Sequence, residues 1–91
     1  MVRPLKPRML HAAPKTYYFK PQGIPLRFLQ EVVLEPDEVE ALKLHDCDNL
    51  NHTQAAEAMN ISQPTFGRIL NRAYKKIAQA IIEGKAIRIV Q

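Results

Sequence analysis

Basic and amide side chains recur along residues 62–76 at a spacing suited to reading double-stranded DNA. If this segment is helical, then at about 100° per residue Arg68, Asn71 and Lys75 lie opposite the apolar Phe66. Arg68 can donate two hydrogen bonds to guanine, and Asn71 or Gln63 can pair in the same way with adenine. The candidate DNA-binding residues are Ser62, Gln63, Pro64, Thr65, Gly67, Arg68, Asn71, Arg72, Lys75 and Lys76.

Two further features of this segment bear on the same chemistry. Arg72, Lys75 and Lys76 suit phosphates, which position a protein on DNA without reading its sequence. Gly67 stands at the edge of the basic face, where a missing side chain lets the helix approach a groove or another backbone. The alternative interpretation is a solvated basic helix face with no ligand.

The residues that must position this face fit a helix-turn-helix at five places between His52 and Arg72. Such a motif needs a small residue where the two helices cross, a residue that tolerates positive φ in the turn, a cap, and apolar residues that point back into the crossing. The residues at those offsets are Ala56, Asn60, Ser62, Phe66 and Ile69.

Capping residues set the expected helix ends. Asn51, followed three residues later by Gln54, predicts a helix start close to a capping box, with the helix ending near Met59. Ser62 caps the next helix, which keeps a 3.6-residue apolar period until Gly84 can stop it. We therefore expect the helix-turn-helix to span residues 51–83.

Outside the helix-turn-helix, the sequence predicts a basic arm and several short elements. Residues 1–15 form a basic, proline-containing arm that either enters a minor groove or is a solubilising tail; its cations are Arg3, Lys6 and Arg8. Residues 16–91 form one domain. Within it, 16–20 and 86–90 have strand patterns and are expected to pair as a two-stranded ribbon, and Leu26, Leu29 and Val32 fit a short helix.

A further helix is expected to start at Pro36, because proline suits the first helical turn. Its apolar residues fall on two faces, Val39 with Leu42 and Ala41 with Leu44. A helix that is apolar on both sides belongs at the centre of a small bundle.

Charge is segregated along the 91 residues, whose net charge is +4. Residues 1–30 carry +6, residues 31–60 carry −7, and residues 61–91 carry +5. This pattern favours two ends that face a polyanion and a middle that faces away from it. It also leaves an alternative function, in which the acidic surface of residues 31–57 docks on a basic protein such as RNA polymerase.

Other chemistries find little support in the sequence. His45, Cys47 and His52 have poor spacing for zinc, so we expect no metal and no cofactor. The aromatic run of residues 17–19 suits a core better than single-stranded bases. There is no phosphate-binding glycine loop and no nucleophile with a plausible base, so we expect no enzyme activity.

With one cysteine, no signal peptide and no apolar run of about 20 residues, we expect a cytoplasmic protein without a membrane span.

Four motifs resemble an uncharacterised prokaryotic family of small proteins predicted to bind DNA. They are Y-Y-F-K-P-x-G-I-P-L (17–26), L-x-P-D-E-V-E-A-L-K-L (34–44), Q-A-A-E-A-M-N-I-S-Q-P-T-F-G-R-I-L (54–70) and I-A-Q-A-I-x-x-G-K-A-I-R-I (77–89). The resemblance covers residues 3–90 and implies a helix-turn-helix similar to region 4 of sigma factors, with a regulatory role. Two positions depart from the pattern: Asn60 stands where the family usually carries glycine, and Gln63 where it often carries arginine.

The sequence thus predicts a mainly α, tri-helical helix-turn-helix domain with a basic N-terminal arm and a small β ribbon. We expect sequence-specific binding of double-stranded DNA in transcription regulation. One recognition helix makes few contacts, so we also expect a homodimer on two half-sites about one helical turn apart.

Overall fold

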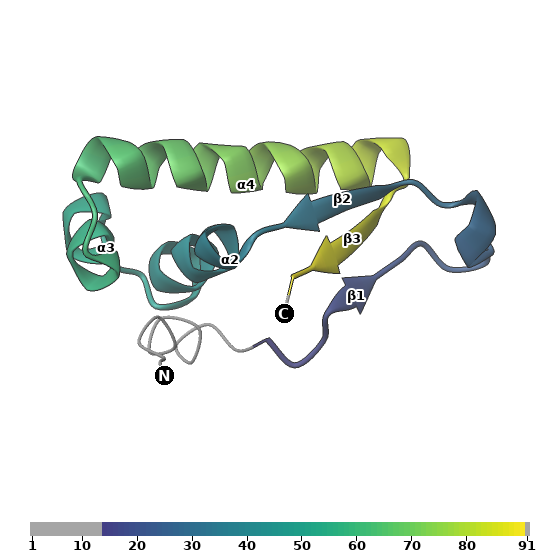
Figure 1. Cartoon of the computed structure of the whole chain (residues 1–91), viewed down its shortest axis with the longest axis horizontal. Coiled ribbons are helices and arrows are strands. Elements are labelled where there is room, and N and C mark those ends of the chain that lie inside the picture. Colours follow the sequence, from purple (N-terminus) through teal and green to yellow (C-terminus); the bar gives the residue numbers. More distant parts are fainter. Residues whose placement is uncertain (1–13, 91) are drawn as a thin grey trace.

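The computed structural model describes residues 14–90, so Arg3, Lys6 and Arg8 of the predicted arm lie outside the described residues. One long helix, α4, runs beside a small sheet at one end and two short helices at the other (Figure 1). The elements in chain order are β1 (Tyr18–Phe19), the 3-10 turn η1 (Leu26–Phe28), β2 (Glu31–Leu34), α2 (Pro36–Leu42), the π-helical turn η2 (Lys43–Cys47), α3 (His52–Met59), α4 (Gln63–Glu83) and β3 (Ala86–Ile89).

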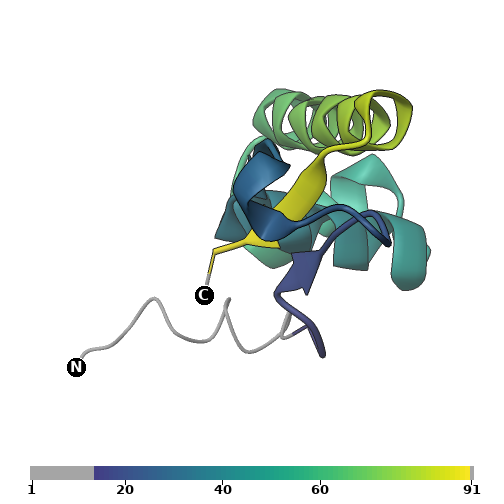
Figure 2. The same ribbon diagram turned by 90° about the vertical axis from the view of Figure 1, so that its right-hand side faces the viewer.

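The sheet has three strands in the order β1-β3-β2. The C-terminal strand β3 is central, antiparallel to β1 with Tyr18 opposite Arg88, and parallel to β2 with Val32 opposite Ile87. The predicted pairing of the two terminal segments is confirmed, but the expected two-stranded ribbon gains a third strand. Viewed along its axis, α4 lies on one side of the sheet (Figure 2).

The third strand corrects the prediction of a short helix through Leu26, Leu29 and Val32. Only residues 26–28 make a 3-10 turn, and Leu29 already has extended backbone angles. In β2 the buried side chains are Val32 and Leu34, which alternate with more exposed neighbours at the two-residue period of a strand. The β-branched pair of residues 32–33 favours this extended conformation.

The core has two parts, and α2 lies between them. Ala41 of α2 and Leu44 of the η2 turn that continues it pack with α3 and α4. Val39 packs against a second cluster, formed by Leu34 and Ile89 of the sheet and Ala73 of α4. The expectation that this helix is buried on two faces is therefore confirmed. No helix within residues 14–90 is long and apolar enough to cross a membrane.

Candidate nucleic-acid interface

Two side chains at the N-terminal end of α3 fix where this helix begins. The Asn51 side chain accepts a hydrogen bond from the Gln54 backbone N–H at 2.8 Å, and the Gln54 side chain accepts one from the Asn51 N–H at 3.0 Å. These two bonds satisfy donors that the first turn of a helix leaves without partners. The capping box predicted from the sequence is therefore present.

A three-residue turn joins α3 to α4. Asn60 has φ 60° and ψ 44°, the left-handed conformation that lets the chain reverse direction. The next N–H, of Ile61, donates to the Ala56 carbonyl at 3.0 Å. Ser62 then caps α4, its hydroxyl accepting from the Thr65 N–H at 3.3 Å. Because each residue of the turn is held, α4 leaves α3 at a defined angle.

Close packing at the crossing holds the same angle. Ala56 and Met59 on α3 are buried against Phe66, Ile69 and Leu70 on α4. The Phe66 side chain is completely buried, and a larger side chain in place of Ala56 would push the two helices apart.

The opposite face of α4 is turned to solvent. Ser62, Gln63, Pro64, Arg68, Asn71 and Lys75 are exposed, and Thr65 and Gly67 are half-buried. A Cβ built on Gly67 would meet no atom within 4 Å, so no neighbour in the fold requires glycine there. Glycine inside a helix costs about 0.5–1 kcal/mol relative to alanine. The fold alone does not explain this residue.

Hydrogen bonds order several of these side chains. The Thr65 hydroxyl accepts from the Ser62 hydroxyl at 2.9 Å and from the Arg68 guanidinium at 3.2 Å. Across the turn, the Thr53 hydroxyl donates to the Gln63 side-chain oxygen at 3.2 Å. The first two turns of α4 therefore present a partly pre-arranged polar surface. The first turn of α4 contains no acidic residue.

Two of the predicted phosphate contacts have partners inside the fold. Arg72 Nε donates to Glu38 Oε2 at 2.8 Å, and Lys76 Nζ donates to Glu38 Oε1 at 2.8 Å and to the Val33 carbonyl at 2.7 Å. The Arg72 side chain remains 52% exposed, whereas that of Lys76 is 28% exposed. Arg72 also lies 3.5 Å from Asp37 Oδ2 but stays partly open to solvent, whereas Lys76 mainly ties α4 to the start of α2.

Glu38, the centre of this ion-pair network, was not a site candidate in the sequence. Its side chain is fully buried and also accepts from the Glu35 backbone N–H at 2.8 Å. Burial raises the pKa of this carboxyl, but the hydrogen bonds from Lys76, the Glu35 backbone and Arg72 outweigh burial and hold the pKa below its ordinary value. The hydrogen bond from Arg72 to Glu38 in turn raises the pKa of Arg72.

Among the weaker candidates, the two histidines have partners inside the fold, whereas Cys47 is exposed. His45 Nδ1 lies 2.7 Å from the Leu50 carbonyl, and the His45 and His52 rings meet edge-on with centroids 4.9 Å apart. Residues 14–90 contain no group of three or more His, Cys, Asp or Glu residues that could hold a metal. In the aromatic run, Tyr17 packs against the second core cluster, and the Tyr18 hydroxyl donates to Glu31 at 2.8 Å. The Phe19 side chain is 52% exposed, so the expectation of a core position is wrong for Phe19.

Comparison with known proteins places this chain in a family. The family model described as a protein of unknown function, DUF134, matches residues 1–91. The chain belongs to the DUF134 family. Similar DUF134 chains include UPF0251 proteins of Desulfosudis oleivorans, 51% identical, and of Caldanaerobacter subterraneus, 47% identical, each over 89 residues and 98% of this chain.

The DUF134 relatives are longer than this chain. The aligned segment covers 64% of the Desulfosudis protein, 75% of the Caldanaerobacter protein and 58% of a UPF0251 protein from Desulforudis audaxviator, which is 52% identical. No solved structure matches this DUF134 chain.

Proposed function

We propose that this DUF134 protein binds double-stranded DNA sequence-specifically and regulates transcription. In this proposal α3, the turn and α4 are a helix-turn-helix of the kind found in region 4 of sigma factors, and α4 enters the major groove. The observation that carries the proposal is the exposed face of Arg68, Asn71 and Lys75 on a helix whose angle is fixed by its neighbour. A major groove about 12 Å wide admits one α-helix.

The side chains on this face divide between two roles. Arg68 and Asn71 can form paired hydrogen bonds with guanine and adenine, and Gln63 can reach the same bases near the start of the helix. Lys75, with the exposed part of Arg72, suits phosphates. The start of α4 adds backbone N–H groups and a positive helix dipole, with no acid in its first turn to oppose a phosphate.

The proposal is tested by selecting bound sites from a random duplex pool and measuring affinity for the selected site by fluorescence anisotropy. Arg68→Ala should cost about 1–3 kcal/mol and relax the base preference at its position, whereas Lys75→Ala should weaken binding to all sequences and reduce the salt slope by about one. Lys20→Ala removes an equal charge from an exposed loop and is the control. Equal affinities for the parent and both α4 variants would exclude this function.

The docking of residues 31–57 on a basic protein such as RNA polymerase has less support. Glu38 and Glu40 are buried, and Glu31 pairs with Arg88 while Asp48 pairs with Lys43. Fewer free carboxylates therefore face solvent than the sequence suggested. A random-duplex gel shift at several salt concentrations separates the two functions, because only DNA binding falls steeply as salt rises.

A further inference from the structure

Two of the side chains proposed to read bases are held by threonine hydroxyl groups. The Thr65 hydroxyl accepts a hydrogen bond from Arg68 Nη2 at 3.2 Å, and the Thr53 hydroxyl donates one to Gln63 Oε1 at 3.2 Å. Threonine suits this role because its branched Cβ restricts χ1, so its hydroxyl group occupies few positions. Each threonine therefore offers a nearly fixed point to which a longer side chain is tied.

The Thr65 hydroxyl is itself anchored to the start of α4. It accepts a second hydrogen bond from the Ser62 hydroxyl at 2.9 Å, and Ser62 Oγ accepts one from the Thr65 backbone N–H at 3.3 Å. A hydroxyl oxygen has two acceptor sites, so both sites of Thr65 are filled. Arg68 uses a single N–H group for its contact and keeps the others, so its guanidinium can still offer paired N–H groups to guanine.

The contact between Thr53 and Gln63 bridges the two helices of the motif. Thr53 lies in the first turn of α3, and Gln63 is the first residue of α4. The Gln63 amide keeps its N–H donors and one acceptor site, which a paired contact with adenine requires. Asn71 and Lys75 differ from this pair, because within residues 14–90 their side chains have no hydrogen-bond partner.

We propose that the two threonines are positioning residues, which hold Gln63 and Arg68 so that this pair sets the base preference of α4. This inference rests on the proposed function. Ordering one long side chain on binding reduces affinity by about 2- to 10-fold, and the held pair is partly ordered before DNA arrives. A side chain without such a contact can also turn to a phosphate or a neighbouring base when its preferred base is absent. The held pair therefore discriminates between bases more strongly than the other side chains of this face.

Substitutions that remove only a hydroxyl group test the proposal. Thr65→Val keeps the shape of the side chain and the backbone N–H that binds Ser62, so the fold should be unchanged, as urea unfolding can check. Anisotropy on the selected duplex and its single-base-pair variants measures the base preference at each position. The positions that Arg68 and Gln63 read are those whose preference is lost in Arg68→Ala and in Gln63→Ala.

The two valine variants should act at different base pairs. Thr65→Val should lower the preference at the Arg68 position by about 2- to 10-fold, less than Arg68→Ala does, without changing the salt slope. Thr53→Val should act in the same way at the Gln63 position alone. Thr65→Ser keeps the hydroxyl group and should restore the preference. Thr16→Val is the matched control, because Thr16 is the remaining threonine and is exposed ahead of β1.

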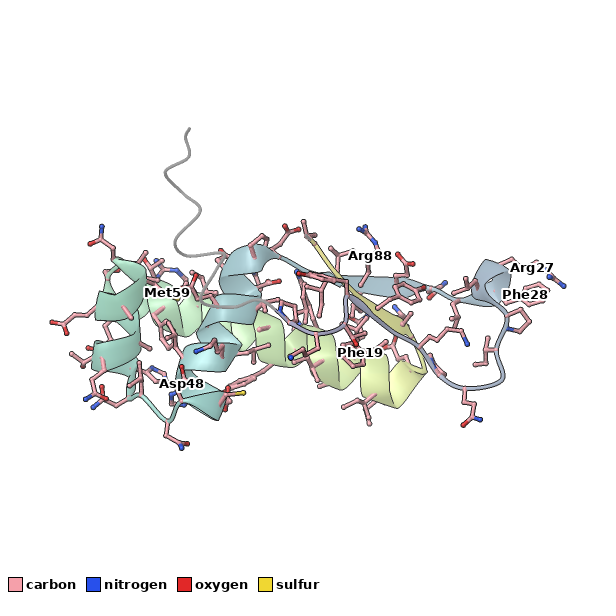
Figure 3. All side chains as sticks on the ribbon, turned by 90° about the horizontal axis from the view of Figure 1, so that it is seen from below. Phe19, Arg27, Phe28, Asp48, Met59 and Arg88 are labelled. Atoms are coloured by element: carbon pink, nitrogen blue, oxygen red, sulfur yellow. The ribbon has the colours of Figure 1, made fainter. Side chains whose placement is uncertain are left out.

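NMR order parameters of arginine Nε–H groups report how firmly these side chains are held when no DNA is present. Thr65→Val should lower the order parameter of Arg68. Arg27 is the internal control: its guanidinium carbon lies 4.7 Å from the centre of the Phe28 ring. Both residues lie at the opposite end of the molecule from Met59 of α3 (Figure 3), so the order parameter of Arg27 should not change.

The outcomes separate this inference from the proposed function. If Arg68→Ala loses base preference while Thr65→Val retains it, DNA binding stands and the positioning role is overturned. An equal loss of affinity for every duplex in Thr65→Val, or an unchanged order parameter for Arg68, would overturn it as well. If the parent protein selects no site from a random pool, the DNA-binding function is excluded together with this inference.

Discussion

Glu38 on α2 and Arg72 on α4 are joined by a 2.8 Å hydrogen bond, although 34 residues separate them in the chain. The carboxylate is fully buried, and Lys76, one turn further along α4, binds its other oxygen. Two cations on one flank of α4 therefore hold a single buried anion at the first turn of α2. This network fixes how α4 lies against the rest of the domain and leaves the opposite faces of the helix free.

Replacing Glu38 should cost much of the stability of so small a domain. Glu38→Gln removes the charge while keeping the shape, and leaves Lys76 without an anion next to the core. Losing one partner of a buried ion pair costs about 3–5 kcal/mol; because Arg72 is half exposed, we expect about 2 kcal/mol. Urea unfolding measures the difference, with the exposed Glu57→Gln as control. A loss below about 0.5 kcal/mol, as for an ordinary surface substitution, would show that the network does not hold α4.

The lowered pKa of Glu38 predicts a dependence of stability on pH. A carboxyl whose pKa is lower in the folded state stabilises the fold at pH values above its ordinary pKa of 4.5, and this contribution is lost as pH falls through the folded pKa. The stability difference between the parent and Glu38→Gln should therefore be constant near pH 6–7 and shrink below pH 4.5. Urea unfolding of both proteins across this range measures it. A stability difference between the two proteins that is unchanged at pH 3 would contradict a lowered pKa for Glu38.

Local signals in the sequence predicted the helix ends correctly. Asn51, Asn60, Ser62 and Gly84 each act through the backbone within a few residues, so their roles can be read without knowing the fold: two cap helices by side-chain hydrogen bonds, and two adopt the left-handed conformation. The part of the site that depends on these residues, the exposed face of α4, was predicted for the same reason.

Features that depend on distant partners were not predicted. Val32 fits both a helix spacing with Leu26 and Leu29 and the alternation of a strand; pairing with β3, more than 50 residues later, decides for the strand. The burial of Glu38 likewise depends on cations that arrive from α4. Arg72 and Lys76 looked like free phosphate contacts because a helical projection shows which side of a helix a residue occupies, but not what lies beside it.

Gly67→Ala should separate stability from DNA binding. The added methyl group meets no atom within 4 Å inside the fold, so the helix gains about 0.5–1 kcal/mol of stability. If α4 enters a groove closely at this point, the same methyl group weakens DNA binding at least severalfold. Thermal unfolding and anisotropy on the selected site measure the two effects. Unchanged affinity would show that DNA does not approach the helix at Gly67.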